Sequence, residues 1–579
     1  MRLSRLLISL SVSWAGAFSF NAYDLGLYGL YPRRHFQSVN LEAPALKTTK
    51  WDSRCDSGNI FLTPRGPWVT GHARGPIILD ARGELIWMDN NDFEQAMNLN
   101  VQSYKGEEYL TFWTKSKKNK HKKHSKKSYV MLNSSYEVVH RITPHGKGLK
   151  GDSHEFRITP QGTALITIYH KHQTDCTKLG VGESCWIQDG LFQEIDIETG
   201  KLLFEWRATD HISMHDVFSK PCRKDGYGTS KQDAFDFFHI NSVDKIESGD
   251  YVISARYMHA VVCISGKTGE ILWQLGGKNN NFRDLNTALD FAWQHHVTWQ
   301  GNNTISIFDN HANSVVHSPS SYSKGMVIQL DLEDMTASLV QKYIHPDKIL
   351  NVSQGSVQIL PESGNVLVGF GNSPTYVEYS AQGDVLCNTH FAPHIAFEII
   401  DFGLAKSYRV FKHPWIGRPN TTPDVKIKHG KAYVSWNGAT EVTGWRLETA
   451  RGLLQENDDG FVTAKELSRD GFETSFALEK AHGYVRLVAL DANNKPITYS
   501  QIIKVPPPSS KLLSSIVFLC LVVSLTGALA FLLPTWKTIR VPRRMPRLSQ
   551  LRSRWYTATR KNREFDAESE PLLLDVRDP

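Results

Sequence analysis

Short stretches of alternating apolar and polar residues recur between about residues 40 and 410, and turns rich in Gly, Asn and Asp separate them. A period of two is typical of β-strands that bury one face. Two kinds of hairpin follow one another: "HEFRITPQGTALITIY" (154–169) precedes "QEIDIETGKLLFEW" (193–206), and "HINSVDKIESGDYVISAR" (239–256) precedes "VVCISGKTGEILW" (261–273). Each such pair predicts an antiparallel unit of four strands.

Six hairpin pairs can be recognised in this part of the chain, and repeated four-stranded units are typical of a β-propeller. A second alternating region covers residues 425–505 and predicts an immunoglobulin- or fibronectin-like β-sandwich. The expected fold class is therefore all-β, with a six-bladed β-propeller over residues 40–410 followed by this sandwich. A pair of β-sandwiches in place of the propeller is the alternative.

Both ends of the chain carry membrane-targeting patterns. Residues 1–17 combine basic residues, an apolar run and an Ala-Gly-Ala cleavage pattern, which predicts a signal peptide. Residues 512–533 form an uncharged apolar run of 22 residues, which is long enough to span a bilayer as a helix. The run therefore predicts a single C-terminal transmembrane helix. Basic residues concentrate after this run, so the positive-inside rule places a basic tail, residues 534–579, in the cytosol. We expect a single-pass type I protein of the secretory or endomembrane system, with most of the chain lumenal or extracellular.

The cytosolic tail ends in a pattern of acidic and leucine residues. Glu568 precedes Leu572 and Leu573 by the spacing of an acidic dileucine sorting signal. A sorting adaptor reads such a signal by burying the two leucines in an apolar pocket. The pattern predicts delivery to an endosome or vacuole, and the alternative is a disordered tail whose leucines occur by chance.

The formal net charge of +7 is not spread evenly over the chain. Lysines concentrate in residues 115–127 and further basic residues lie in the tail, so the remainder is net negative. A nucleic-acid partner is therefore not expected, because phosphate binding requires a basic surface on the folded domain. We interpret the lysine-rich stretch as a solvated loop, with contact to a polyanion or a membrane as the alternative.

Six of the seven cysteines precede the expected membrane helix and would face the oxidising side, where an even number favours disulfides. Cys176 and Cys185 are the natural short-range pair, and the pairing of the others stays open. Acceptor triplets for N-glycosylation agree with a secretory route and lie at Asn133, Asn302, Asn351 and Asn420.

Polar residues occupy one register of the predicted units. The position eight residues before each first-hairpin turn is small or polar in all six: Gly58, Asn98, His154, Asn241, His295 and Ser356. If the first strand of each blade lines the central channel, these positions form a ring at one mouth. A hairpin brings its end back beside its beginning, so Arg256 lies level with Asn241. His239 lies two residues before Asn241, on the same face.

Histidine, asparagine and arginine side chains together suit a tetrahedral oxyanion such as sulfate or phosphate. The imidazoles of His154, His239 and His295 could instead bind zinc. Arg256 argues against zinc, because its positive charge would repel the metal ion. Neither a Gly-rich phosphate loop nor a paired-cysteine metal motif occurs, so no metal or nucleotide cofactor is expected.

The motifs "DSHEF", "FHIN", "SAR" and "QHH" resemble the active-site motifs of the arylsulfotransferase family, most closely those of its fungal branch. The resemblance covers about residues 55–500. It implies a β-propeller enzyme that moves a sulfuryl group between phenols without a nucleotide donor. It also implies that His295 becomes sulfated, with the sulfonate surrounded by His154, His239, Asn241 and Arg256.

This chain departs from the fungal pattern at one position. That pattern commonly reads Gln-His-Asp, whereas here His296 follows His295. His296 is therefore either a substrate-binding neighbour of the nucleophile or the nucleophile itself.

The expected function is that of a membrane-anchored lumenal arylsulfotransferase, which transfers a sulfuryl group from an aryl sulfate to a phenolic acceptor through a sulfohistidine. A neutral imidazole is a good nucleophile near neutral pH, and a phenolate is a fair leaving group. His154 or His239 would exchange the phenol proton. Two alternatives stay open. One is a propeller receptor that binds an anion or other ligand without turnover. The other is a quinoprotein-dehydrogenase-like propeller, because "SGKTGEILW" resembles the repeat of those enzymes.

Overall fold

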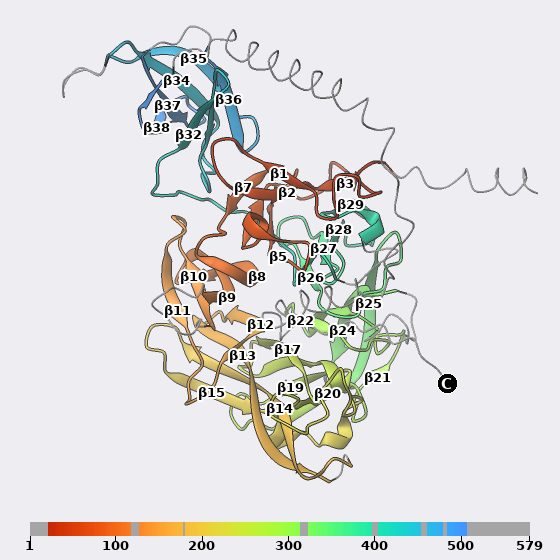
Figure 1. Cartoon of the computed structure of the whole chain (residues 1–579). Helices are drawn as coiled ribbons and strands as arrows, with labels where there is room; N and C mark the ends of the chain where they lie inside the picture. The colour runs from red at the N-terminus through yellow and green to blue at the C-terminus, as the bar shows by residue number, and fades with distance from the viewer. Residues whose placement is uncertain are drawn as a thin grey trace, which may run out of the picture.

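A computed structural model describes residues 21–116, 127–177, 180–312, 322–396, 403–452, 460–478 and 483–506. The expected all-β fold class is correct, because strands supply nearly all the regular structure of these ranges (Figure 1). The short helical elements are α2 (Ala208–His211) and the 3-10 turns η1 (Gly71–Ala73), η3 (Met214–Asp216), η4 (Arg256–Met258) and η5 (His394–Ala396).

The described ranges contain no helix that is long and apolar enough to cross a membrane. The expected signal peptide, residues 1–17, lies outside these ranges. The expected membrane helix, residues 512–533, and the tail with its sorting pattern also lie outside them.

Between residues 47 and 413, six sheets in the described part of the chain contain four antiparallel strands in a row. The first has the order β31-β4-β6-β7, with strands Phe411–His413, Asn59–Leu62, Ile77–Leu79 and Leu85–Met88. The second runs from β8 to β11, with strands Phe93–Tyr104, Glu107–Ser116, Lys127–Leu132 and Val138–Ile142. The third runs from β12 to β15, with strands Gly151–Ile158, Thr163–Cys176, Gly182–Asp196 and Leu202–Arg207.

The other three sheets repeat this meander. The fourth runs from β17 to β20, with strands Ile240–Lys245, Tyr251–Ala255, Ala260–Ile264 and Ile271–Gly276. The fifth runs from β22 to β25, with strands His295–Trp299, Thr304–Asp309, Lys324–Asp331 and Thr336–Ile344. The sixth runs from β26 to β29 and then to β3, with strands Ser356–Ile359, Val366–Gly369, Thr375–Tyr379, Val385–His390 and Lys47–Lys50.

Short strands complete this region. Strands β16 (Phe235–Asp236) and β21 (Arg283–Asp284) add to the third and fifth sheets in parallel. Two separate two-stranded sheets pair β1 with β2 and β5 with β30, with strands Arg33–His35, Glu42–Pro44, Pro64–Arg65 and Lys406–Ser407.

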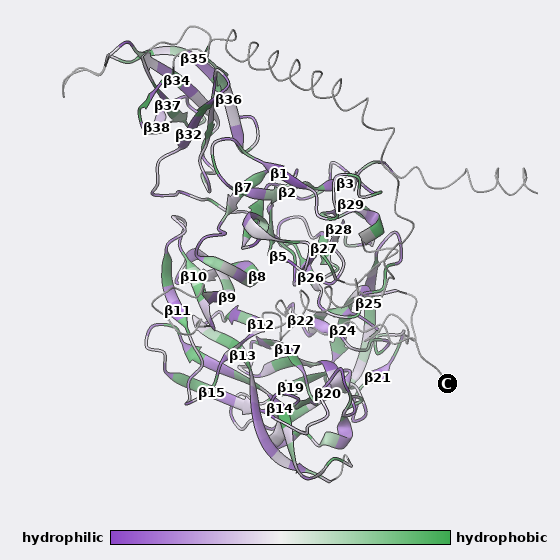
Figure 2. Ribbon diagram, in the orientation of Figure 1, coloured by the Kyte–Doolittle hydropathy of each residue, from purple (hydrophilic) through white to green (hydrophobic). Residues whose placement is uncertain are grey.

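The period of two divides each middle strand between two hydrophobic cores. In the fourth sheet, Ile253 and Val262 pack into a core shared with the third sheet, whereas Val252 and Val261 pack into a core shared with the fifth. Figure 2 shows the matching alternation of hydrophobic and hydrophilic segments along the strands. Burying one such side chain stabilises the fold by roughly 1.5–3 kcal/mol. Neighbouring sheets are therefore held face to face.

The inner strands of successive sheets contact one another in a closed series: β8, β12, β17, β22, β26 and β31. The set of inner strands differs from the predicted register in the first sheet. Gly58 precedes β4, which is the second strand of its sheet, and the inner strand there is β31. A segment from the end of this region pairs with β4 (Phe411↔Phe61), so the inner strand comes from more than 300 residues away in the sequence. Local pattern could not reveal that pairing.

Disulfides tie the chain at two places. Cys176–Cys185 was expected and is confirmed, and Cys55–Cys387 joins the N-terminal part to the sixth sheet. Cys222 and Cys263 are not disulfide-bonded, so four of the six cysteines on the expected oxidising side form disulfides. Burial raises the pKa of the Cys263 thiol to about 12, which keeps it protonated.

The C-terminal region contains two sheets that share one core. The smaller has the order β32-β33-β36, with strands Asp424–Lys428, Lys431–Ser435 and Glu473–Ala477. The larger has the order β35-β34-β37-β38, with β39 beside β37, and strands Val462–Ser468, Gly444–Ala450, Tyr484–Leu490, Pro496–Tyr499 and Ile503–Lys504. Val434 and Phe476 of the first sheet pack in one cluster with Trp445 and Leu487 of the second.

Candidate functional site

Three histidines predicted from the sequence lie beside one another on successive inner strands. The ring centres of His154 and His239 are 5.1 Å apart, and those of His239 and His295 are 6.4 Å apart. His154 is in β12, His239 directly precedes β17, and His295 begins β22. Three successive sheets therefore supply one histidine each, as the register predicted.

The first two histidines each face a carboxylate. Nδ1 of His154 lies 2.5 Å from Asp152 Oδ2, and Nδ1 of His239 lies 2.5 Å from Asp236 Oδ2. Burial raises the pKa of Asp152, but the charge and hydrogen bonds of His154 outweigh it and hold the carboxyl ionised. Each pair directs Nδ1–H at its carboxylate and leaves Nε2 for a ligand. Sequence reasoning quoted "DSHEF" without giving Asp152 a role.

His295 has a different environment, with only 2% of its surface exposed. Its Nδ1 lies 2.6 Å from Asn310 Oδ1, and the Asn310 amide nitrogen donates to backbone carbonyls of residues 351 and 354. Asn310 Oδ1 must therefore accept, which places the imidazole hydrogen on Nδ1 and the lone pair on Nε2. The Gln354 N–H donates to that Nε2 at 3.2 Å.

Burial lowers the pKa of His295 well below its ordinary value, and the positive charge of Arg256 and the neighbouring His239 lower it further. The ring is therefore neutral at physiological pH. A neutral imidazole with a defined tautomer is the form that can attack an electrophile.

The hairpin count predicted that Arg256 lies level with Asn241, but Arg256 lies level with His239, two residues earlier: its backbone N–H donates to His239 O at 3.2 Å. A bulge between Ile240 and Ser242, which the count did not include, contributes to this shift. The Arg256 side chain is fully buried, and Nη2 donates to Val352 O at 2.8 Å. The guanidinium also lies over the rings of Tyr257 and Trp293, at 5.1 and 5.5 Å from their centres. Arg256 thus places a fixed positive charge beside neutral His295.

Asn241 is fully buried between the fourth and fifth sheets. Its Nδ2 donates to Gln294 O at 2.7 Å, which ties it to the residue before His295. Its Oδ1 accepts no hydrogen bond from the described residues. A ligand with a donor group could satisfy that oxygen.

His296 has other neighbours than the cluster. Its Nδ1 accepts from the Val357 N–H at 3.2 Å, and its ring meets Phe411 edge-on at 5.5 Å. The strand has a bulge here and His296 has φ 51°, which sends its side chain away from that of His295. The structure thus places His295, and not His296, beside His239 and Arg256.

The remaining register positions provide the scaffold. Asn98 is buried and donates to Glu155 Oε1 at 3.1 Å, and Ser356 is buried and donates to Val410 O at 3.1 Å. Gly58 lies outside the ring of inner strands, as described above.

Arg409, which the sequence analysis did not identify, lies just before β31 and occupies the position in the ring that had been assigned to Gly58. Its side chain is 1% exposed, and it donates to Glu155 Oε1 at 2.9 Å, to Asn98 Oδ1 at 3.0 Å and to Asn241 O at 3.0 Å. One guanidinium thus joins the second, third and fourth sheets next to the histidines. No local motif marks this arginine, because its partners are distant in sequence.

Aromatic side chains surround the first two histidines. The Tyr169 ring lies 5.4 Å from His154 and 5.7 Å from His239, Tyr408 lies 5.6 Å from His154, and Tyr257 lies 5.0 Å from His239. Burial raises the pKa of Tyr169 far above its ordinary value, so it stays neutral. These rings form an aromatic wall around the two imidazoles.

The backbone is strained at this end of the sheets. His239, Trp293 and Gln354 have φ of 55°, 56° and 68°, a region that side chains other than glycine seldom occupy. Such conformations persist where surrounding contacts enforce them, and they concentrate at functional sites. Among the described side chains, no group of three or more His, Cys, Asp or Glu could hold a metal ion.

Acid should destabilise this protein through its buried neutral histidines. Burial is the main cause of a lowered pKa in His259 (to about 3), in His345, His390 and His413 (to about 4), and in His295 and His296. In the unfolded chain a histidine titrates near pH 6.5, so below that pH the unfolded state binds more protons. Each neutral histidine then costs about 1.4 kcal/mol per pH unit.

We therefore expect the thermal unfolding midpoint to fall between pH 7 and pH 5. Asp189 acts in the opposite direction, since burial raises its pKa to about 6, and the raised pKa values of Asp225, Asp244 and His311 act in the same sense as Asp189. The six buried histidines dominate, because the lowering of their pKa values is large. A midpoint that is unchanged or higher at pH 5 would show that these imidazoles are not buried as described.

The chain matches the family model described as arylsulfotransferase (ASST) over residues 100–392, just over half of its length. No curated protein matches it. Solved structures match with low scores. A protein of unknown function from Bacteroides caccae is 13% identical, with 62% of this chain and 99% of that chain covered and a TM-score of 0.34.

Two further matches are named proteins. The Cps50 (Swd1) β-propeller domain of Myceliophteria thermophila is 8% identical (59% and 95% covered, TM-score 0.28). A catalytically inactive virginiamycin B lyase from Staphylococcus aureus is 9% identical (70% and 94% covered, TM-score 0.26). Likenesses this weak carry no argument about this chain.

Proposed function

Because the chain belongs to the arylsulfotransferase (ASST) family, we propose that it transfers a sulfuryl group from an aryl sulfate to a phenol through a sulfohistidine at His295. One observation carries the proposal: His295 is a buried, neutral imidazole of defined tautomer beside Arg256 and His239. This arrangement combines a nucleophile with a fixed positive charge where sulfonate oxygens would lie.

In the first half-reaction, the Nε2 lone pair of His295 attacks sulfur. An N–S bond forms, the S–O bond to the aryl group breaks, and the phenolate leaves with the electron pair. The Gln354 N–H must first release Nε2, because it donates to this atom in the free protein. The Asn310 oxygen accepts from Nδ1–H and stabilises the positive charge that develops on the ring.

In the second half-reaction, a phenol replaces the departed phenolate. His239 or His154 takes the phenol proton at Nε2, and Asp236 or Asp152 stabilises the resulting imidazolium. The phenol oxygen attacks sulfur, the N–S bond breaks, and the electron pair returns to His295. The tyrosine wall around these two histidines offers an apolar surface to the aryl ring of each substrate.

Arg256→Lys is expected to lower kcat/KM for sulfate transfer about a hundredfold, because a single ammonium cannot reproduce a planar fork held under two aromatic rings. Arg283→Lys is the matched control. Arg283 is exposed and lies on β21, at the outer edge of the fifth sheet, whereas the cluster lies at the inner strands. Release of phenolate from a chromogenic aryl sulfate measures both rates. Equal rates in the two variants would remove Arg256 from the site.

The same assay tests the proposed function as a whole. Continuous release of phenolate that depends on an added phenol acceptor is the expected result. Saturable binding of the aryl sulfate without release would instead favour an anion-binding receptor.

We also propose that the six four-stranded sheets are the blades of one β-propeller. The closed series of contacts between inner strands supports this, as does the completion of the first and sixth sheets by strands from the opposite ends of the region, β31 and β3. The two C-terminal sheets would be a separate β-sandwich.

The site is proposed to face the lumen of the secretory system, anchored by residues 512–533. Two disulfides within the described ranges support an oxidising compartment. Glycosylation, considered next, would require the same side.

A further inference from the structure

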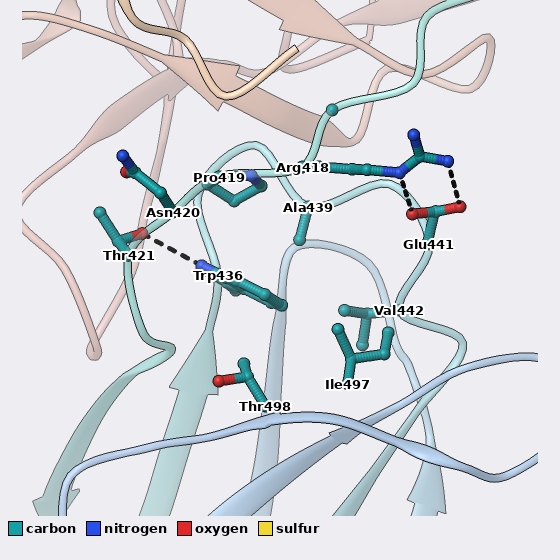
Figure 3. Close-up of a pocket in the computed structure, with 11 residues that line it drawn as sticks. Arg418, Pro419, Asn420, Thr421, Trp436, Ala439, Glu441, Val442, Ile497 and Thr498 are labelled. Atoms are coloured by element: carbon teal, nitrogen blue, oxygen red, sulfur yellow. Dashed lines mark hydrogen bonds and ion pairs between the residues drawn. The ribbon is translucent and has the colours of Figure 1, made fainter.

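A pocket of about 340 Å³ lies where the second sheet meets the C-terminal sheets. Its walls come from the segment before β32, from the segment between β33 and β34 and from β38 (Figure 3). The Tyr136 hydroxyl donates to Gly438 O at 2.8 Å, and the Arg418 N–H donates to Ser134 O at 2.7 Å. The pocket therefore lies beside contacts that hold the two regions together.

The pocket combines an apolar wall with a polar rim. Figure 3 shows Trp436 at its centre, with Val442 and Ile497 facing it, and the Arg418–Glu441 ion pair at one side. Ile497 leaves 41% of its surface exposed. A ligand with one face of C–H groups and an edge of hydroxyls, as in a sugar ring, matches this distribution.

Asn420 lies on the rim and belongs to the triplet Asn420-Thr421-Thr422, an acceptor for N-glycosylation. Its side chain is exposed, and Nδ2 donates to Glu137 Oε1 at 2.7 Å. Figure 3 shows this side chain turned away from Trp436, so Asn420 must give up the bond to Glu137 and rotate before a sugar on Nδ2 can enter the pocket.

The four triplets differ in accessibility. Asn351 is fully buried and accepts from the Ser373 N–H, so a glycan there is incompatible with the fold. The Asn133 oxygen accepts two backbone N–H groups within its own turn. Asn302 is exposed at a hairpin turn, and it does not line this pocket.

We propose that Asn420 carries an N-linked glycan and that its first N-acetylglucosamine occupies this pocket. The proposal rests on the lumenal location proposed above, and it is independent of the sulfotransferase activity. The covalent link keeps the sugar at an effective concentration in the millimolar range, so weak contacts with Ile497 and Trp436 are enough to seat it. The seated sugar would then stabilise the junction.

The test uses the full chain secreted from a eukaryotic host and trimmed enzymatically to one N-acetylglucosamine per site. Glycopeptide mass spectrometry should find the sugar at Asn420 and Asn302. Thr422→Ala abolishes the acceptor triplet and leaves Asn420 and its bond to Glu137 in place. Asn302→Gln is the matched control, because it removes a sugar that lies outside this pocket.

Amide hydrogen exchange of peptides covering residues 415–423 and 436–443 gives a local readout. We expect exchange about five- to tenfold faster in Thr422→Ala than in the trimmed wild type, and no change in Asn302→Gln. An unmodified Asn420 beside a modified Asn302 would overturn the proposal, and so would equal exchange in wild type and Thr422→Ala. No sugar at either site would overturn it together with the lumenal location, whereas the phenolate assay reports separately on sulfate transfer.

Discussion

His295→Ala is expected to lower sulfate transfer by at least about a thousandfold, because it removes the proposed nucleophile and no neighbouring atom can replace Nε2. The account gives His239 and His154 the phenol proton instead, because each pairs its Nδ1 with a carboxylate that can stabilise an imidazolium. Phenolate release from a chromogenic aryl sulfate measures the loss.

His296→Ala is the matched control for this variant. Both rings are buried and accept one backbone N–H, so both variants should lose a similar amount of stability, about 1–3 kcal/mol. Their activities should differ, with His296→Ala retaining most of its transfer rate. An active His295→Ala protein and an inactive His296→Ala protein would mean that the register is wrong by one residue.

Arg409→Leu is expected to destabilise the protein by about 3–5 kcal/mol, because it leaves the Glu155 carboxylate buried without its partner. Adding Glu155→Gln to Arg409→Leu should recover part of the loss, since the second change removes the uncompensated charge. Denaturant unfolding of the single and double variants measures both effects.

Arg54→Leu provides the comparison for a surface ion pair. Arg54 is 58% exposed beside Asp52, so its removal should change stability by less than about 1 kcal/mol. If Arg409→Leu were as mild as Arg54→Leu, the guanidinium would not be the link between sheets that its three hydrogen bonds indicate.

The parts of the site that were predictable depend on local geometry. A period of two marks strands, and a hairpin returns its end beside its start, so the sequence placed Arg256 within two residues of its observed level beside His239. The carboxylates Asp152 and Asp236 were also within reach, because each lies two or three residues before a histidine. This short spacing is the sequence signal that could have identified them, because an acid so close to a histidine can accept a hydrogen bond from its Nδ1.

The remaining features depend on contacts between distant segments. β31 becomes the inner strand of the first sheet by pairing with β4, and this pairing brings Arg409 into the ring. The Cys55–Cys387 disulfide spans 332 residues, so spacing gave no indication of it. The separation of His296 from His295 depends on a bulge and a positive φ, which an alternating pattern does not encode.

Mass analysis of the protein after brief incubation with a chromogenic aryl sulfate tests the central claim most directly. The account predicts the added mass of one SO₃ group on a peptide that contains His295, located on that imidazole by fragmentation, lost on addition of a phenol and absent from His295→Ala. Phenolate release without any adduct would contradict it, and so would an adduct confined to His296, His239 or His154.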